Sequence, residues 1–280
     1  MPFHFLLVAD WIYALLMGVV QGLTEFLPVS SSGHLSLLNL FFGIDAEAGL
    51  DFTFFLHVAT LVAALIYFRK DIAGLVCAWL PKNEEAMAGQ RRISVFLLVS
   101  CLITGPMALL LEDHLAFIAS SFLLLGFAFL ATALLLTLTE ILVLRMTHKC
   151  DMDDMGFARA ALIGFVQGCA VIPGISRSGA TIVGGMWAGL SRENATRYSF
   201  LLAIPIIMAG VAKDGYDLLK GGVSALPPFA ISALGFIAAG ISGYFAIAGM
   251  IKLVQRTSLV YFALYVALLG LILIAVSFIV

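Results

Sequence analysis

The sequence predicts an all-α polytopic membrane protein. The chain of 280 residues is 62% hydrophobic and 11% charged, with a mean hydropathy of +1.10. Soluble domains average roughly 45–50% apolar and about 25% charged residues. Several apolar windows reach the ~20 residues that a helix needs to cross a bilayer. Two polar segments with related sequences interrupt this apolar chain, and they predict that the protein is built from two repeats.

The predicted elements are of two kinds. Shorter apolar pieces at 11–27 and 35–43 flank the first polar segment, and pieces at 157–172 and 180–190 flank the second. A further short apolar piece at 72–80 is ambiguous. We therefore expect about six transmembrane helices plus two re-entrant helical hairpins. The six full spans are predicted near 52–68, 93–111, 117–144, 197–213, 228–250 and 259–279.

The basic residues predict the orientation. If those spans are right, twelve of the fifteen Lys and Arg residues share one side of the membrane, which the positive-inside rule makes cytoplasmic. The acidic segments Asp45–Asp51 and Glu112–His114 then face outward. Each half of the chain, 1–150 and 151–280, holds one hairpin and three spans. Because three is odd, the second half is inverted relative to the first, within a single membrane domain (1–280). The twelve residues are Arg69, Lys70, Lys82, Arg91, Arg92, Arg145, Lys149, Arg159, Arg192, Arg197, Lys252 and Arg256.

The two polar segments resemble each other. Residues 14–34 read ALLMGVVQGLTEFLPVSSSGH, and residues 160–181 read AALIGFVQGCAVIPGISRSGAT. Charged and hydroxyl side chains are costly in apolar sequence and mark a functional site. Inverted repeats with broken helices place such sites near the membrane midplane, so we expect the two polar turns to meet. Small residues recur at four-residue spacing and predict close helix packing: Ala14, Gly18 and Gly22 in one segment, and Ala160, Gly164 and Gly168 in the other.

The first segment supplies a carboxylate and an imidazole. Gln21 and Glu25 are four residues apart and share one face of a helix. Ser30, Ser31 and His34 follow a break in that helix. A carboxylate with an imidazole suits general acid–base work or metal binding.

The second segment is typical of a phosphate-binding turn. Ser176, Arg177, Ser178 and Thr181 lie in a glycine-flanked turn that opens a new helix near residue 179. Helix N-termini bind anions, and an arginine adds two-pronged recognition of phosphate. The two segments together predict a phosphate site with acid–base groups beside it.

At these residues the chain resembles the integral-membrane undecaprenyl-diphosphate phosphatases of the bacitracin-resistance type. The family motif of Glu or Gln, three residues, Glu and FLPVSS[ST]GH matches Gln21–His34. The second motif, PGxSRSGxT, matches Pro173–Thr181. The flanking stretches HVATLVA (57–63), YFRKD (67–71) and SFLLAIP (199–205) are also similar, so the resemblance covers nearly the whole chain.

This resemblance implies hydrolysis of undecaprenyl diphosphate to undecaprenyl phosphate and inorganic phosphate, with Mg²⁺ or Ca²⁺ as cofactor. The reaction recycles the lipid carrier of cell-wall synthesis and confers bacitracin resistance. It is expected at the outer face of the bacterial cytoplasmic (inner) membrane. Gln21 replaces the Glu of many members, which leaves Glu25 as the main anionic metal ligand.

The residues are then expected to divide the work as follows. Glu25, His34, Ser31 and Arg177 are catalytic, and Glu25 with Gln21 holds the cation. Either Ser31 or a water attacks, with Glu25 or His34 assisting, and the sequence leaves both choices open. The substrate-binding residues are Gln21, Ser30, Ser176, Arg177, Ser178 and Thr181.

The same residues raise two other functions. A lipid-phosphate transporter or flippase would use the same site. A membrane phosphatase that forms a phosphohistidine is rejected, because Val183 stands where it needs a second histidine. Membrane lipids are expected neighbours, a homodimer is left open, and no nucleic-acid signature is present. We assign His57 to packing or a supporting role, and Glu140 to reaching toward water from its helix end.

Overall fold

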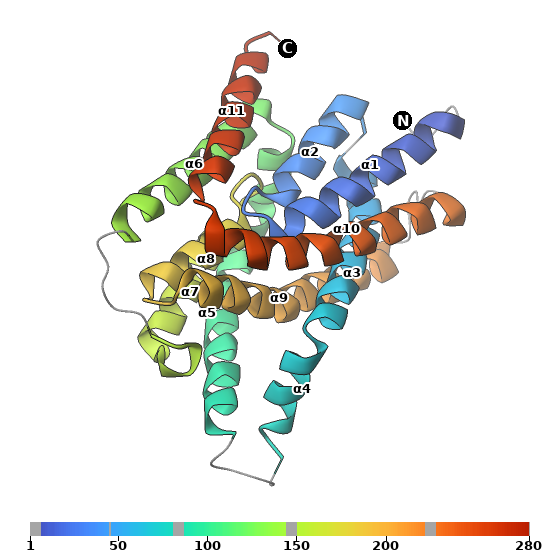
Figure 1. Cartoon of the computed structure of the whole chain (residues 1–280). Coiled ribbons are helices and arrows are strands. Elements are labelled where there is room, and N and C mark those ends of the chain that lie inside the picture. The colour runs from blue at the N-terminus through green and yellow to red at the C-terminus, as the bar shows by residue number, and fades with distance from the viewer. Residues whose placement is uncertain (1–6, 45, 81–86, 144–149, 222–227, 280) are drawn as a thin grey trace.

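The chain folds as a bundle of α-helices, which confirms the all-α prediction (Figure 1). The computed structural model describes residues 7–44, 46–80, 87–143, 150–221 and 228–279. Asp45, Lys82, Arg145 and Lys149, which the orientation argument used, lie outside these ranges. The helices are α1 (Leu7–Phe26), α2 (Ser31–Phe42), α3 (Ala46–Tyr67), α4 (Arg69–Cys77), α5 (Ala88–Ala119), α6 (Phe122–Val143), α7 (Phe157–Cys169), α8 (Arg177–Trp187), α9 (Arg192–Gly221), α10 (Phe229–Arg256) and α11 (Val260–Val276).

Long apolar helices make this a multi-pass membrane protein. By length and composition, α5, α6, α9 and α10 each suffice to cross a bilayer. The predicted span at 52–68 is instead the first part of a broken pair, because Phe52–Tyr67 and Arg69–Cys77 meet at 72°. The prediction that a span starts at 117 is wrong, since α5 continues to Ala119 and α6 begins at Phe122. The last predicted span forms the 17-residue α11.

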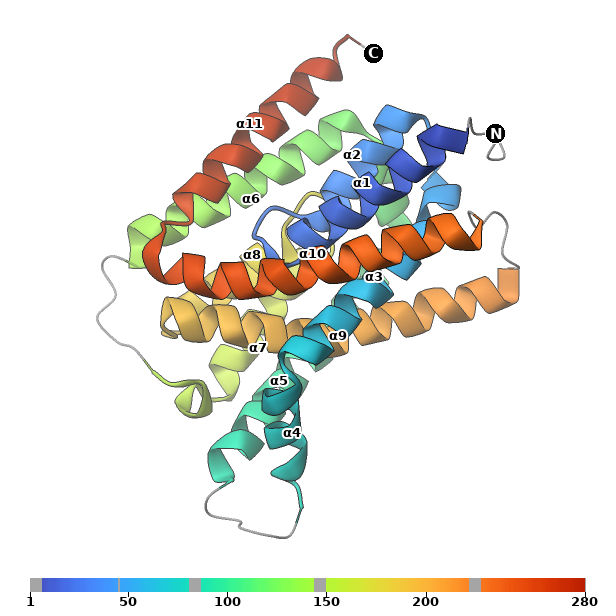
Figure 2. The same ribbon diagram turned by 45° about the vertical axis from the view of Figure 1, so that its right-hand side comes forward.

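Two hairpins bring the polar segments together in the middle of the molecule (Figure 2). α1 packs on α2 and α7 packs on α8, and each pair is joined by one polar turn. Ser178 Oγ donates to the Leu27 carbonyl at 2.7 Å. The Gly174 N–H donates to Ser30 Oγ at 3.2 Å. The prediction that the two turns meet is confirmed.

The small residues of each hairpin face a long helix. α1 lies along α10, and α7 lies along α5. A methyl group added at Gly22 would lie 2.4 Å from the Ala239 carbonyl oxygen, and one at Gly164 would lie 2.5 Å from that of Ser100. Only glycine allows these backbones to approach so closely, as the four-residue spacing predicted.

α8 is the most enclosed of the short helices. All of its residues from Ser178 to Met186 are buried, and it packs against α6, α7 and α9. Its N-cap is Ser176, whose hydroxyl accepts the Gly179 N–H at 3.0 Å. This cap starts the helix next to the first hairpin and so places Arg177 in the interior.

Candidate functional site

Glu25 is the centre of the polar site. It lies on α1, one turn after Gln21, and both side chains are buried. Gln21 Nε2 donates to Glu25 Oε2 at 3.0 Å. Ser31 Oγ, at the start of α2, donates to the same oxygen at 2.5 Å. The carboxylate is therefore in place to accept a proton from the hydroxyl of Ser31.

Arg177 reaches Glu25 from the second hairpin. Its Nη2 forms an ion pair with Glu25 Oε1. Its Nη1 is buried and has no hydrogen-bond partner among the described residues. A buried, unpaired donor is costly, and a guanidinium with a free donor is suited to a phosphate oxygen. The structure thus brings together three predicted catalytic residues, Glu25, Ser31 and Arg177.

The other predicted hydroxyls build the two turns. Ser30 Oγ accepts the N–H groups of Gly33 and Gly174. Ser178 Oγ donates a hydrogen bond to the Leu27 carbonyl, and Ser176 Oγ caps α8. Thr181 Oγ1 bonds to the Arg177 carbonyl at 2.9 Å and to Ser199 Oγ at 2.5 Å. In this state the four predicted substrate-binding hydroxyls hold the backbone of the turns, and their part in substrate binding stays a prediction.

His34 lies on the side of α6 and α11. Its Nδ1 bonds to the Ser30 carbonyl at 2.6 Å, and its Nε2 bonds to the Tyr265 hydroxyl at 2.7 Å. Its ring meets that of Phe129 edge to face. In the part of the chain that the structure describes, no hydrogen bond or ion pair joins His34 to Glu25. Its catalytic role stays a prediction.

The imidazole beside Glu25 belongs to His57 instead. His57 Nε2 lies 4.0 Å from Glu25 Oε2. One turn further along α3, Thr60 Oγ1 accepts from Gln21 Nε2 at 3.5 Å. Sequence reasoning had given His57 a supporting role. The signal available was two polar residues three apart on an apolar helix, a spacing that places both on one face.

The protein groups around Glu25 fit a cation only in part. Across the described ranges, no three His, Cys, Asp or Glu side chains form a metal cluster. However, Gln21 Oε1 is buried and finds no partner in the described part of the chain, and it belongs to an amide that contacts Glu25. Mg²⁺ is often held by one or two carboxylates together with substrate phosphates and water. The residues present fit a cation of that kind.

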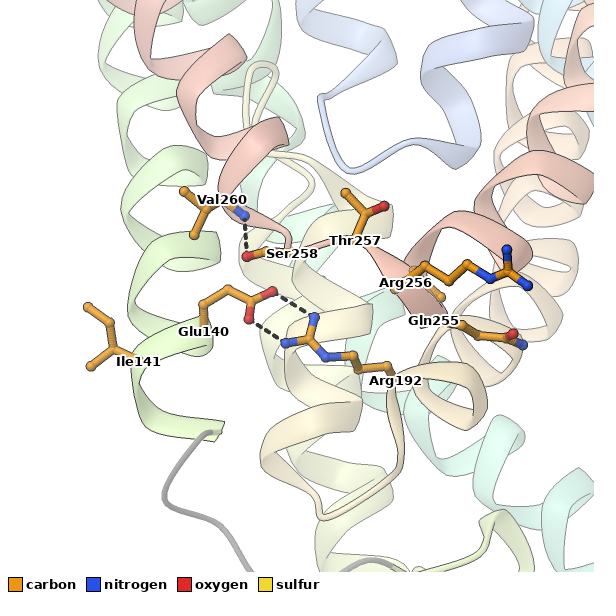
Figure 3. A pocket seen from close by; sticks show the side chains of 9 residues that line it. Glu140, Ile141, Arg192, Gln255, Arg256, Thr257, Ser258 and Val260 are labelled. Atoms are coloured by element: carbon orange, nitrogen blue, oxygen red, sulfur yellow. Dashed lines mark hydrogen bonds and ion pairs between the residues drawn. The ribbon is translucent and has the colours of Figure 1, made fainter.

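A separate pocket lies where α6, α9 and the α10–α11 connection meet (Figure 3). Arg192 Nη1 and Nη2 donate to the two carboxylate oxygens of Glu140, and the Leu259 N–H donates to Glu140 Oε1 at 2.6 Å. The expectation that Glu140 reaches toward water is therefore wrong, because its carboxylate is buried and paired. This ion pair ties the end of α6 to the starts of α9 and α11.

The fold and the site define a class: a multi-pass membrane protein in which two broken-helix hairpins assemble one buried acid–guanidinium pair. Residues 14–272 match the family described as Bacitracin resistance protein BacA. The chain belongs to this family.

Curated relatives align over almost the full length. An undecaprenyl-diphosphatase of Bacteroides fragilis (strain YCH46) is 38% identical, with 96% of this chain and 98% of the relative covered. An undecaprenyl-diphosphatase of Methanosphaera stadtmanae is 37% identical at the same coverage. Undecaprenyl-diphosphatase 4 of Bacillus cereus is 34% identical over 96% of this chain and 98% of its own length.

Proposed function

We propose that this protein hydrolyses undecaprenyl diphosphate to undecaprenyl phosphate and inorganic phosphate. The observation that carries the proposal is the Glu25 carboxylate, which holds the Ser31 hydroxyl on one oxygen and the Arg177 guanidinium on the other. A potential nucleophile (Ser31) and a phosphate-binding guanidinium (Arg177) therefore both contact the carboxylate that can act as the base. The names of the relatives support the substrate. The reaction returns the lipid carrier to cell-wall synthesis and lowers sensitivity to bacitracin.

Arg177 binds the diphosphate in this proposal. Its free Nη1 takes a phosphate oxygen, and the guanidinium stabilises the charge that develops as the phosphoanhydride bond breaks. Glu25 accepts the proton of the attacking group. If that group is Ser31, its Oγ bonds to the terminal phosphorus, undecaprenyl phosphate leaves, and water then releases phosphate from the serine. If water attacks, phosphate forms in one step.

A divalent cation, Mg²⁺ or Ca²⁺, is proposed as cofactor. Glu25 and the free Oε1 of Gln21 would hold it. When bound, such an ion neutralises negative charge on the transferring phosphoryl group. Ser30, Ser176, Ser178 and Thr181 keep the two turns in the positions that this arrangement needs.

We also propose that 1–150 and 151–280 are inverted repeats within one membrane domain. The pairing of helices supports this. α1 packs on α10 as α7 packs on α5, and α6 packs on α11. In the proposed repeat, α1 corresponds to α7, α5 to α10 and α6 to α11. The contact of α1 with α10 is then equivalent to the contact of α7 with α5, and the contact of α6 with α11 is equivalent to itself.

The proposed location is the bacterial inner membrane with the site open to the outer face. A membrane-impermeant thiol reagent on intact spheroplasts tests this in a chain without its native cysteines. We expect a cysteine at Ser120, an exposed position between α5 and α6, to be labelled. A cysteine at Asp151, exposed before α7, should be spared. The opposite pattern would reverse the orientation, and labelling of both would show that α6, which separates the two positions, does not cross the membrane.

Phosphate release by the purified protein in detergent is the deciding experiment. Transport has no meaning in detergent, so release from a C55 prenyl diphosphate identifies hydrolysis. A chelator should stop it, and added Mg²⁺ or Ca²⁺ should restore it. Absence of release under every metal condition would refute the proposal. The transporter alternative finds no support, because the relatives described above are named as diphosphatases. A homodimer stays a prediction.

A further inference from the structure

The imidazole of His57 faces Glu25 with a lone pair. His57 Nδ1 lies 3.1 Å from the Thr53 carbonyl oxygen. A carbonyl oxygen only accepts hydrogen bonds, so Nδ1 carries the hydrogen. In the neutral ring Nε2 is then an acceptor, and it is Nε2 that lies 4.0 Å from Glu25 Oε2. Two electron-rich atoms face each other across a gap.

The width of that gap fits a bridging cation. Ions such as Mg²⁺ lie about 2.1 Å from each ligand, so two ligands of one octahedral ion are about 3.0 Å apart when adjacent and about 4.2 Å apart when opposite. The observed 4.0 Å is close to the distance between opposite ligands. Gln21 is a third candidate ligand beside Glu25, because its Nε2 lies 3.0 Å from Glu25 Oε2 and its Oε1 is buried with no partner among the described residues. A half-turn of its amide exchanges Nε2 for Oε1 beside Glu25.

We propose that His57 is a ligand of the divalent cation, through Nε2, together with Glu25 and Gln21. This inference rests on the cation of the proposed function. His34 does not offer the same group, because both of its ring nitrogens are bonded, to the Ser30 carbonyl and to the Tyr265 hydroxyl. The ion takes its other ligands from water or from the oxygens of the diphosphate.

A nitrogen ligand changes which metal the site prefers. Ca²⁺ takes oxygen ligands in large, flexible shells, whereas imidazole suits first-row transition ions. The site is therefore expected to bind Mn²⁺ more tightly than Ca²⁺. His57 sets that preference, while Glu25 contributes the charge that either ion needs.

Mn²⁺ bound to the purified protein without substrate tests the inference directly. Electron paramagnetic resonance measures the free and bound Mn²⁺, and its electron spin echo modulation detects a nitrogen on the bound ion. We expect a nitrogen signal in the unmodified protein and its loss in His57→Asn. The Mn²⁺ affinity should fall about tenfold or more in His57→Leu. In His57→Asn, the ratio of Mn²⁺ to Ca²⁺ affinity should fall as well.

His114→Asn is the matched control, because His114 is an exposed histidine on α5. It should leave both the signal and the affinity unchanged. Bound Mn²⁺ without nitrogen modulation, an unchanged affinity in both His57 variants, or no Mn²⁺ binding at all would overturn the inference. Phosphate release on the same preparations separates the two proposals. If the protein releases phosphate but shows no nitrogen on bound Mn²⁺, only the proposal that His57 is a metal ligand is refuted. If it binds Mn²⁺ through nitrogen but releases no phosphate, only the proposed phosphatase function is refuted.

Discussion

The first and second hairpins have the same scaffold but different charges. Each carries a glycine face, and each starts its second helix with a serine cap, Ser30 on α2 and Ser176 on α8. Four residues after the shared glutamine, however, the first hairpin has Glu25 and the second has Val171. Directly after the cap, the first has Ser31 and the second has Arg177.

The two glutamines also make equivalent contacts. Gln21 Nε2 donates to Thr60, and Gln167 Nε2 donates to Thr104 at 2.9 Å. Both glutamine Oε1 atoms are buried without a partner in the described residues. The two hairpins thus differ in the reactive side chains that they carry, and this difference shows that the site is divided. One hairpin supplies acid and hydroxyl, the other the guanidinium, and neither is a site by itself.

The largest effect is expected when the first hairpin loses its charge. Glu25→Gln keeps the shape but removes the base and the anionic metal ligand, so phosphate release should fall on the order of 10³-fold. Added Mg²⁺ should not restore it. The matched change at the equivalent position of the second hairpin, Val171→Gln, should leave most of the activity. Steady-state assays of both variants check this, and an active Glu25→Gln variant would contradict the division.

The next largest effect is expected at Arg177, the guanidinium that the second hairpin supplies. Arg177→Lys keeps a charge but loses the planar fork that matches phosphate. We expect phosphate release to fall about 100-fold or more, which corresponds to ~2.7 kcal/mol of transition-state stabilisation. The melting temperature should change little, because the lysine can still face Glu25. Near-full activity would mean that Arg177 acts only as a structural charge.

The glycine faces should differ in stability rather than in rate. A methyl group at Gly22 meets Ser242 Oγ at 2.0 Å and a backbone oxygen of α10, which cannot move away. A methyl group at Gly168 meets the Met107 sulfur at 2.3 Å, on a flexible side chain. Gly22→Ala should therefore cost about 1–3 kcal/mol and Gly168→Ala less. Thermal unfolding in detergent measures both, and equal losses would show that the two helix contacts are equivalent.

The smallest effect is expected at Gln21. Gln21→Glu adds a second carboxylate beside the proposed cation, so activity should be kept and Mg²⁺ affinity kept or improved. Gln167→Glu buries a charge without a cation and should destabilise the protein. Metal titrations of activity and melting curves test this pair. Loss of activity in Gln21→Glu would show that the charge belongs at position 25 alone.

Much of this site follows from sequence because its signals are local. The four-residue spacing of Gln21 and Glu25, the glycine faces and the Ser-Arg turn depend on neighbours along one helix, and a repeated segment predicts that its copies meet. Contacts between distant helices leave no such signal. His57 and Thr60 share one face of an apolar helix, but nothing local shows that this face meets Glu25 on α1.

The same limit explains the other misses. Glu140 was expected at water because sequence does not show that Arg192 begins another helix beside it. The 72° break between α3 and α4 falls at Phe68, where neither glycine nor proline marks it. Sequence also does not show that Ser30 and Ser178 hold the two turns together, while their part in substrate binding stays a prediction.

The pairing of Glu25 with Arg177 also bears on how the protein is made. The two residues are 152 positions apart, so during synthesis the first hairpin enters the membrane long before its partner exists. Until α8 arrives, the Glu25 carboxylate lacks the cation that compensates its burial, and an unpaired charge at that depth is costly. The first hairpin should remain loosely inserted in a nascent chain. It becomes fixed only when the second half is in the bilayer, so that the lipid carrier meets a competent site only on a completed protein.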